Sequence, residues 1–387
     1  MTGFAIKGWC PGALRPMRSG DGLVVRIRPH GGRLSRAQAV GIAELATRFG
    51  NGLMDVTSRA NLQIRGVDDD GHAPLIEGLA QLDLIDADAA SEAQRNIVVT
   101  PFWTKGDETV ALAVELELTL VARRLALPVK FGFAVDCGPE RALAGTSADI
   151  RIEREASGGL IVRADGAECG RAVARSDAVG RALELADWFV ASGGASDGGG
   201  RMAAHLAAGA HIPAALAGSA IPVPLMPQPR PGLHADGALV GVAFGQLTAA
   251  TLRGLADKAC GLRLTPWRMI LAEGLRDMPA GEGIVTDADD PILRVIACSG
   301  APACGEANAE TRALGAAMAV HLPADGRLHV SGCAKGCAHP APSPLTLVAT
   351  ADGFDLVQDG SARDVPVLRG LARDQILADP AMLRRIA

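Results

Sequence analysis

Residues 28–35 read R-P-H-G-G-R-L-S and residues 49–59 read F-G-N-G-L-M-D-V-T-S-R, with an amphipathic stretch between them. Ser35 is a suitable N-cap, so a helix is expected to start there and end at the second stretch. The same order of turn, helix and strand recurs around residues 242–248 (V-A-F-G-Q-L-T) and 259–268 (A-C-G-L-R-L-T-P-W-R). A unit that recurs in this way predicts a duplicated chain.

Each copy continues with a strand that enters a loop, then a long helix and another strand, which indicates an α+β fold. A proline-rich segment (213–231) separates the two copies and is typical of a linker. We expect the following divisions: 1–70, first half-domain; 71–200, first α/β domain; 201–235, linker; 236–280, second half-domain; 281–387, second α/β domain.

Four cysteines between residues 298 and 337 follow the pattern C-x5-C-x28-C-x3-C. Four thiolates from two loops suit a [4Fe-4S] cluster, because each iron takes one cysteine. Structural zinc also takes four cysteines, usually in pairs about two to four residues apart, and only the second pair has that spacing. The spacing also leaves open two disulfides, which need an oxidising compartment, and four inert buried cysteines.

The surroundings of the cysteines favour the cluster. Glycines lie beside both pairs, so that backbone N–H groups can approach the sulfur atoms. Residues 295–297 and 327–331 are expected to form strands that each end at one cysteine pair, with a helix over 306–320 between them.

Basic side chains are found mainly in the first copy. Arg59, Asn61, Gln63 and Arg65 alternate along an expected strand and share one face. By itself such a face is more often a solvated sheet surface than a binding site. A pseudo-twofold arrangement would bring this set and the cysteines of the second copy together across a central cleft.

Composition limits the class of protein. The chain has 387 residues, 48% of them hydrophobic and only 3% aromatic, with no tyrosine, so its cores must be built from alanine, leucine and valine. A net charge of −5 with dispersed cations argues against a nucleic-acid surface. There is no bilayer-length apolar run and no signal-peptide core at the start, so we expect a cytoplasmic protein without membrane association.

The duplicated layout and the cysteine pattern resemble the sulfite/nitrite reductase haemoprotein family over nearly the whole chain. Three short runs carry the resemblance as well: T-S-R-A-N-L-Q (57–63), R-N-I-V-V-T-P (95–101) and L-P-V-K-F (127–131). Within that family the chain is most similar to the precorrin-3B synthases, on its short length and on C-P-G-A-L-R-P-M (10–17), the run 49–66 and S-G-C-A-K-G-C-A-H-P (331–340).

The resemblance implies two ferredoxin-like half-domains and two α/β domains with pseudo-twofold symmetry, which hold a cluster and a tetrapyrrole. It places the [4Fe-4S] cluster on Cys298, Cys304, Cys333 and Cys337, with Cys337 facing the tetrapyrrole. It also implies a further mononuclear non-haem iron, for which His339 and His30 are the nearest histidines. No catalytic residue is assigned; the implied substrate-binding residues are Arg28, Arg59, Gln63, Arg95 and Lys130.

The implied reaction is the O2-dependent hydroxylation of precorrin-3A at C-20 with γ-lactone formation, in aerobic cobalamin biosynthesis. A sirohaem-dependent sulfite or nitrite reductase is the alternative. Ala60 and Gly132 depart from the reductases, which have glutamine and a second lysine there. A large polycarboxylate spreads its charge and depends less than sulfite on that one cation. A zinc-stabilised, non-catalytic module is a third and less favoured hypothesis.

Electrons are expected to come from a separate reductase that uses NADH. The glycine-rich segment 192–201 does not follow an expected strand and lacks a clean G-x-G-x-x-G, so it does not indicate a nucleotide site.

Overall fold

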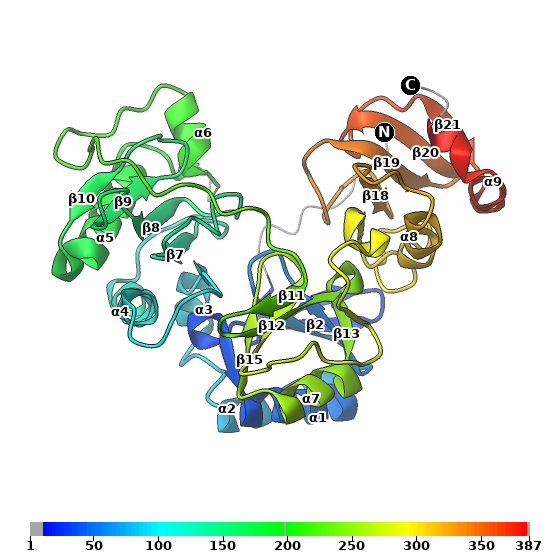
Figure 1. Ribbon diagram of the computed structural model, residues 1–387, viewed down its shortest axis with the longest axis horizontal. Helices are drawn as coiled ribbons and strands as arrows, with labels where there is room; N and C mark the ends of the chain where they lie inside the picture. Colours follow the sequence, from blue (N-terminus) through cyan, green and yellow to red (C-terminus); the bar gives the residue numbers. More distant parts are fainter. Residues whose placement is uncertain (1–10, 197–198, 385–387) are drawn as a thin grey trace.

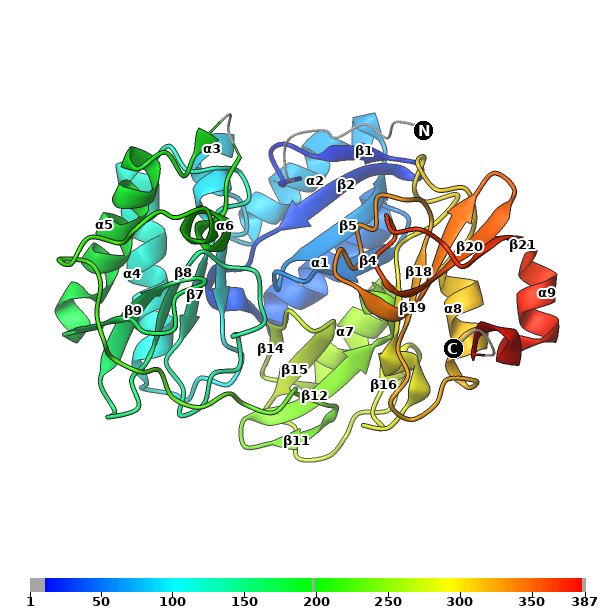
Figure 2. The ribbon, with the colours of Figure 1, turned by 90° about the horizontal axis from the view of Figure 1, so that it is seen from above.

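The computed structural model describes residues 11–196 and 199–384, so Cys10 lies outside the described residues. Two sheets with helices beneath them form a base, and two α/β lobes rise from it (Figure 1). Seen from above, the base lies between the two lobes (Figure 2). No helix in the described ranges is long and apolar enough to cross a membrane.

The two base sheets exchange a strand. The first has the order β1-β2-β5-β4-β13, and β13 comes from the second copy of the repeat. The second has the order β11-β12-β15-β14-β3, with β16 paired to β12, and β3 comes from the first copy. The strands are β1 (Met17–Ser19), β2 (Gly22–Ile27), β3 (Arg33–Ser35), β4 (Leu53–Val56), β5 (Leu62–Val67), β11 (Gly232–His234), β12 (Gly237–Val242), β13 (Gln246–Thr248), β14 (Gly261–Leu264), β15 (Met269–Glu273) and β16 (Ile284–Val285).

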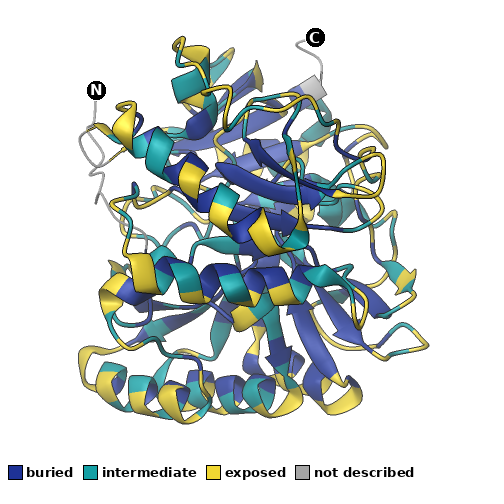
Figure 3. Ribbon diagram, turned by 90° about the vertical axis from the view of Figure 1, so that its left-hand side faces the viewer, coloured by how far each residue is buried: buried dark blue, intermediate teal, exposed yellow. Residues whose placement is uncertain are grey.

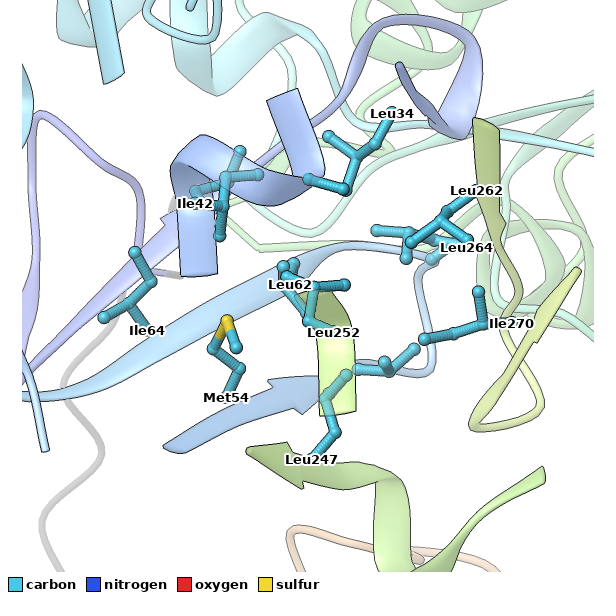
Figure 4. Close-up of a cluster of buried hydrophobic side chains, with 14 of the residues drawn as sticks. Leu34, Ile42, Met54, Leu62, Ile64, Leu247, Leu252, Leu262, Leu264 and Ile270 are labelled. Carbon is cyan, nitrogen blue, oxygen red and sulfur yellow. The ribbon is translucent and has the colours of Figure 1, made fainter. Parts of the chain in front are cut away.

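Helices α1 (Arg36–Phe49), α2 (Asp69–Gln81) and α7 (Ala249–Lys258) cover the lower face of both sheets (Figure 1). The predicted N-cap at Ser35 is confirmed, because its side chain accepts the Gln38 N–H, and Thr248 caps α7 in the same way by accepting the Thr251 N–H. Apolar side chains from both copies meet in one core (Figure 4). The two half-domains therefore share a core and are expected to fold together.

The turn between β4 and β5 and the turn between β14 and β15 show which residues of the two copies are equivalent. Thr57 Oγ1 accepts the N–H groups of Arg59 and Asn61, and Thr265 Oγ1 accepts those of Trp267 and Met269. The third residue after each threonine is left-handed, Ala60 with φ 54° and Arg268 with φ 60°. Arg59 therefore corresponds to Trp267, and Ala60 corresponds to Arg268.

The two lobes have one topology, with three parallel strands followed by an antiparallel extension. The long helices of the first lobe bury one face and expose the other (Figure 3). The first lobe contains α3 (Ala89–Gln94), β6 (Ile97–Val99), α4 (Glu108–Arg123), β7 (Phe133–Asp136), β8 (Ile150–Arg154), β9 (Leu160–Ala164), β10 (Arg171–Val173), α5 (Ala178–Ala191) and α6 (Met202–Ala207). The second contains β17 (Val295–Ala297), α8 (Arg312–Ala319), β18 (Leu328–Ser331), β19 (Ser343–Thr350), β20 (Gly353–Gly360), β21 (Leu368–Leu371) and α9 (Arg373–Ala378).

Two expected elements are shorter than predicted. The helix expected over 306–320 begins only at Arg312, because side-chain and backbone bonds of Asn308 and Thr311 hold the preceding residues as a loop. The apolar run from Val129 to Val135 is also expected to be a strand, but the strand begins at Phe133, and Lys130 lies in the turn before it. Residues 220–225 are not a detached linker, since they form bridges to residues 141, 155 and 170 at the first lobe.

Two buried ion pairs of opposite polarity occupy equivalent places in the base sheets. In the first sheet Arg65 pairs with Asp55 at 3.1 Å, and with Asp21 at 2.8 Å. In the second sheet Arg263 pairs with Glu273 at 2.6 Å.

Each of these two arginines also donates hydrogen bonds to backbone carbonyls of one lobe. Arg65 donates to the Ala303 carbonyl of the second lobe at 2.9 Å, while Arg263 donates to the Pro101 and Trp103 carbonyls of the first lobe at 2.7 Å. Each base sheet therefore anchors the lobe of the other copy.

We predict that Arg65→Met lowers the free energy of unfolding by about 3–5 kcal/mol, because it leaves the largely buried Asp21 carboxylate without a cation and leaves Asp55 with Arg312 alone. Urea unfolding followed by tryptophan fluorescence measures this change. Arg18→Met is the matched control, since Arg18 pairs with Asp69 on the surface and should cost less than about 1 kcal/mol. Equal costs for the two variants would contradict a structural role for Arg65.

Candidate functional site

The predicted cysteines lie at the carboxyl ends of two adjacent parallel strands. Cys298 directly follows β17 and Cys333 follows β18 after one glycine. Sites in α/β sheets typically form at this edge. The Gly332 N–H donates to the Cys298 sulfur at 3.1 Å, so the two cysteine loops are in direct contact.

The four sulfur atoms lie close enough to influence one another's charge. Burial raises the pKa of the Cys333 thiol, the Lys335 N–H opposes this rise, and the thiolates of Cys304 and Cys298 add to it. Burial also raises the pKa of Cys337, where the Lys335 charge lowers it and the other three thiolates raise it again. A cationic group among the four cysteines would relieve this repulsion.

A single metal ion and a cluster need different arrangements of the four cysteines. Among residues 11–196 and 199–384, no three or more histidine, cysteine, aspartate or glutamate side chains converge on one ion position. Zinc needs four ligands at roughly 2.0–2.3 Å from one point, whereas a [4Fe-4S] cluster takes one thiolate on each iron. The cluster on Cys298, Cys304, Cys333 and Cys337 stays a prediction, and so does the mononuclear iron.

The histidine candidates for that iron lie apart. His30 Nδ1 is 2.8 Å from a Glu117 oxygen in the first copy. His339 stands beside the Pro342 carbonyl and against the ring of His329 in the second lobe.

The loop between Cys298 and Cys304 is firmly held. The Ala303 carbonyl accepts hydrogen bonds from the Gly20 N–H at 3.2 Å, the Ser19 hydroxyl at 2.6 Å and the Arg65 guanidinium at 2.9 Å. The two cysteine loops are also joined by the Asn308 N–H, which donates to the Gly332 carbonyl at 2.8 Å. The cysteines are thus positioned before any group binds.

Two of the predicted substrate residues meet at the edge of the first lobe. Arg59 donates to Asn96 Oδ1 at 3.2 Å and to the Lys130 carbonyl at 3.1 Å. Lys130 is exposed, and Asn96 also donates to the Phe131 carbonyl at 2.7 Å. Arg59 and Lys130 therefore form a basic group that solvent reaches.

Arg28 and Arg95 lie in a different, buried network. Arg28 pairs with Glu92 at 3.1 Å, and Arg95 binds both oxygens of Asp86, at 2.6 and 2.8 Å. Arg95 also donates to the Arg28 carbonyl at 3.0 Å. Burial alone would lower the pKa of Arg95, but the carboxylates of Asp86, Glu117 and Glu92 together outweigh it and the pKa is raised. Both charges are neutralised within the protein, which favours a positioning role.

Gln63 is half-buried on the upper face of the first sheet. It lies opposite Arg26 on β2 and Asp55 on β4. Arg65, on the same face, is only 5% exposed. The solvated sheet surface expected for this strand is therefore wrong at Arg65, because Asp21 and Asp55 neutralise it there.

Arg268 is a residue that sequence reasoning missed. Its guanidinium donates to the Ala338 carbonyl, next to Cys337, at 3.0 Å. Burial first, and then the Arg312 charge, lower the pKa of Arg268 to about 10. The repeated T-S-R and T-P-W-R turns were the available signal, although a residue-by-residue alignment pairs the two arginines one position out of register.

Comparison with known proteins agrees with this geometry. Residues 15–82 match the model of the nitrite/sulfite reductase ferredoxin-like half domain. The solved structure of the NirA protein of Mycobacterium tuberculosis has a TM-score of 0.57 at 16% identity, covering 92% of this chain and 79% of NirA. The fold is thus that of the nitrite/sulfite reductase-like class.

A curated relative narrows the assignment. Precorrin-3B synthase of Sinorhizobium sp is 30% identical over 406 residues, covering 93% of this chain and 84% of the relative. The chain therefore belongs to the precorrin-3B synthase family.

We predict that Cys333→Ser, purified without oxygen, loses most of the bound iron and the broad visible absorption of an iron–sulfur protein, because one cluster ligand is gone. Iron and acid-labile sulfide assays measure this. Cys169→Ser is the matched control, since Cys169 is partly buried in the first lobe, away from the cysteine loops. Iron content that is the same in wild type and Cys333→Ser would remove Cys333 from the ligand set.

Proposed function

We propose that the protein is a precorrin-3B synthase, which hydroxylates precorrin-3A at C-20 with O2 while the ring-A acetate closes a γ-lactone. The observation that carries this proposal is the relationship to a precorrin-3B synthase over 93% of the chain. One oxygen atom of O2 enters the product and the other leaves as water, so the reaction also consumes two electrons and two protons. A separate NADH-dependent reductase supplies the electrons.

Cys298, Cys304, Cys333 and Cys337 would hold a [4Fe-4S] cluster, which supplies electrons one at a time when bound. The chain itself would hold the cluster in a fixed position. The Gly332 N–H stabilises negative charge on the Cys298 sulfur, and the bonds to Ala303 fix the first cysteine loop on the base. N–H groups that point at cluster sulfurs are a recognised means of tuning reduction potential.

The basic group at the first lobe fits a polycarboxylate. Arg59 can bind a carboxylate with two parallel hydrogen bonds, and Lys130 adds an exposed cation. Arg28 and Arg95 hold the segment that carries His30, and Gln63 adds a polar group on the upper face of the base. A tetrapyrrole acid would bind Arg59 and Lys130 through its carboxylates and lie over Gln63.

Gly132 supports the choice of substrate. A Cβ at this position would lie 2.8 Å from the Asn96 amide nitrogen, so a lysine there requires Asn96 to move. Asn96 in turn orients Arg59. The chain therefore has Gly132 in place of the second lysine of the sulfite reductases, and Asn96 holds Arg59 in position. The sirohaem reductase alternative is supported by the shared fold alone.

The proposal is tested by incubating anaerobically reconstituted protein with precorrin-3A, a reductase and ¹⁸O2. We expect a product that is heavier by one labelled oxygen atom, together with labelled water. Reduction of sulfite or nitrite, with precorrin-3A left unchanged, would reject the proposal in favour of the alternative.

In the same assay, Arg59→Gln should raise the KM for precorrin-3A roughly tenfold or more, because one charge-assisted hydrogen bond contributes about 1.5–3 kcal/mol. Its iron content should match the wild type. Arg36→Gln is the control, since Arg36 is an exposed residue of α1 paired with Asp257. An unchanged KM for precorrin-3A would show that Arg59 does not bind the substrate.

A further inference from the structure

A pocket of about 770 Å³ lies on the second copy, separate from the Arg59 and Lys130 group. Its walls come from the Phe244 and Arg268 turns of the base and from residues 288–296 of the second lobe. Ala338 and His339, which follow Cys337 directly, close one side. The first copy contributes Ser58 to the lining.

The pocket lies at the position in the second copy that is equivalent to the position of the predicted basic residues in the first copy. The equivalent turns align Trp267 with Arg59. Strands β6 and β17 start each parallel sheet, and their registers against β7 and β18 align Leu293 with Arg95 and Asp325 with Lys130. None of the second-copy residues at these three positions is basic.

The second copy has instead gained arginines at neighbouring positions. Arg268 stands where the first copy has Ala60, and the same registers align Arg294 with Asn96 and Arg327 with Gly132. All three line the pocket. The duplicated site has thus kept cationic character but changed its geometry, which suits a different ligand.

These arginines have unused capacity to donate hydrogen bonds. Arg294 Nε is buried and has no hydrogen-bond partner among the described residues. Arg268 donates to a carbonyl and Arg327 to the Gln228 side-chain oxygen at 3.1 Å. In contrast, Arg230 at the pocket edge pairs with Asp289. Buried donors without partners are rare in proteins, so an anionic ligand is a direct explanation.

Asp289, Asp290 and Asp325 also line the pocket, and Asp289 is paired with Arg230. Part of the remaining wall is apolar. Phe244, Trp267 and Ile296 line it, with Pro229 and Pro231 from the segment between the copies. Trp267 is held in place by stacking on Phe102, with ring centroids 5.9 Å apart. Pockets of this size with an apolar wall and a few convergent polar groups are typical small-molecule sites.

We propose that this pocket is a second binding site, for an organic anion whose flat apolar body lies against Phe244 and Trp267 and whose carboxylate or phosphate is bound by Arg268, Arg294 and Arg327. The site adjoins the residue after Cys337, so its ligand would sit beside the cysteine loops. The proposal does not depend on precorrin-3A being the substrate.

Two probes distinguish the acid groups: flavin mononucleotide, which carries a phosphate, and coproporphyrin I, which carries carboxylates. Each is titrated anaerobically into the full chain and followed by quenching of probe fluorescence. The background for all variants is Arg59→Gln/Lys130→Gln, which weakens the first basic group. We expect at least one probe to bind with a stoichiometry near one, and Arg294→Gln/Arg327→Gln to weaken it roughly tenfold or more.

Arg253→Gln is the matched control, because Arg253 is an exposed residue of α7 that pairs with Glu44, and its affinity should equal that of the background protein. Circular dichroism confirms that each variant is folded. Failure of both probes to bind, or equal binding by the Arg294/Arg327 variant and the control, overturns the proposal. Probe binding by the background protein, together with no turnover of precorrin-3A by the wild type, would keep this site and reject the proposed function.

Discussion

The exchange of β3 and β13 between the base sheets is the constraint on which the rest of the structure depends. Leu34 of the first copy pairs opposite Leu262, and Leu247 of the second copy pairs opposite Met54. Neither sheet is complete without a strand from the other copy, and both bury their lower faces in one core. The relative position of the two lobes follows from this shared base, and so does the placement of the cysteines.

Duplication followed by divergence explains the asymmetry of the chemistry. The carboxyl ends of the parallel strands carry cysteines in the second lobe, whereas the first lobe has Thr100 after β6 and Asp136 at the end of β7. The equivalent ion pairs have reversed polarity between the sheets, with Arg65 in one and Glu273 in the other. Both sheets keep one charge of each sign, so the polarity changed while the pairing was retained.

Much of the fold could be predicted from the sequence, because its signals are local. Ser35 indicates the start of a helix, and the cysteine pairs follow apolar strands. The strand exchange could not be predicted, because β3 and β13 are three-residue segments whose partners lie in the other copy. The burial of Arg28 and Arg95 could not be predicted either, since their partners Glu92 and Asp86 lie in a polar stretch that carries no recognisable motif. Sequence reasoning located the basic set but did not separate its solvent-facing and buried members.

The central claim is that this duplicated scaffold carries an iron–sulfur cluster without sirohaem and acts on a tetrapyrrole as substrate. An absorption spectrum of anaerobically purified protein, followed by acid–acetone extraction of any pigment, tests it most directly. We predict broad iron–sulfur absorption and no extractable sirohaem. Sharp tetrapyrrole bands with extractable sirohaem would contradict the claim and identify a sulfite or nitrite reductase.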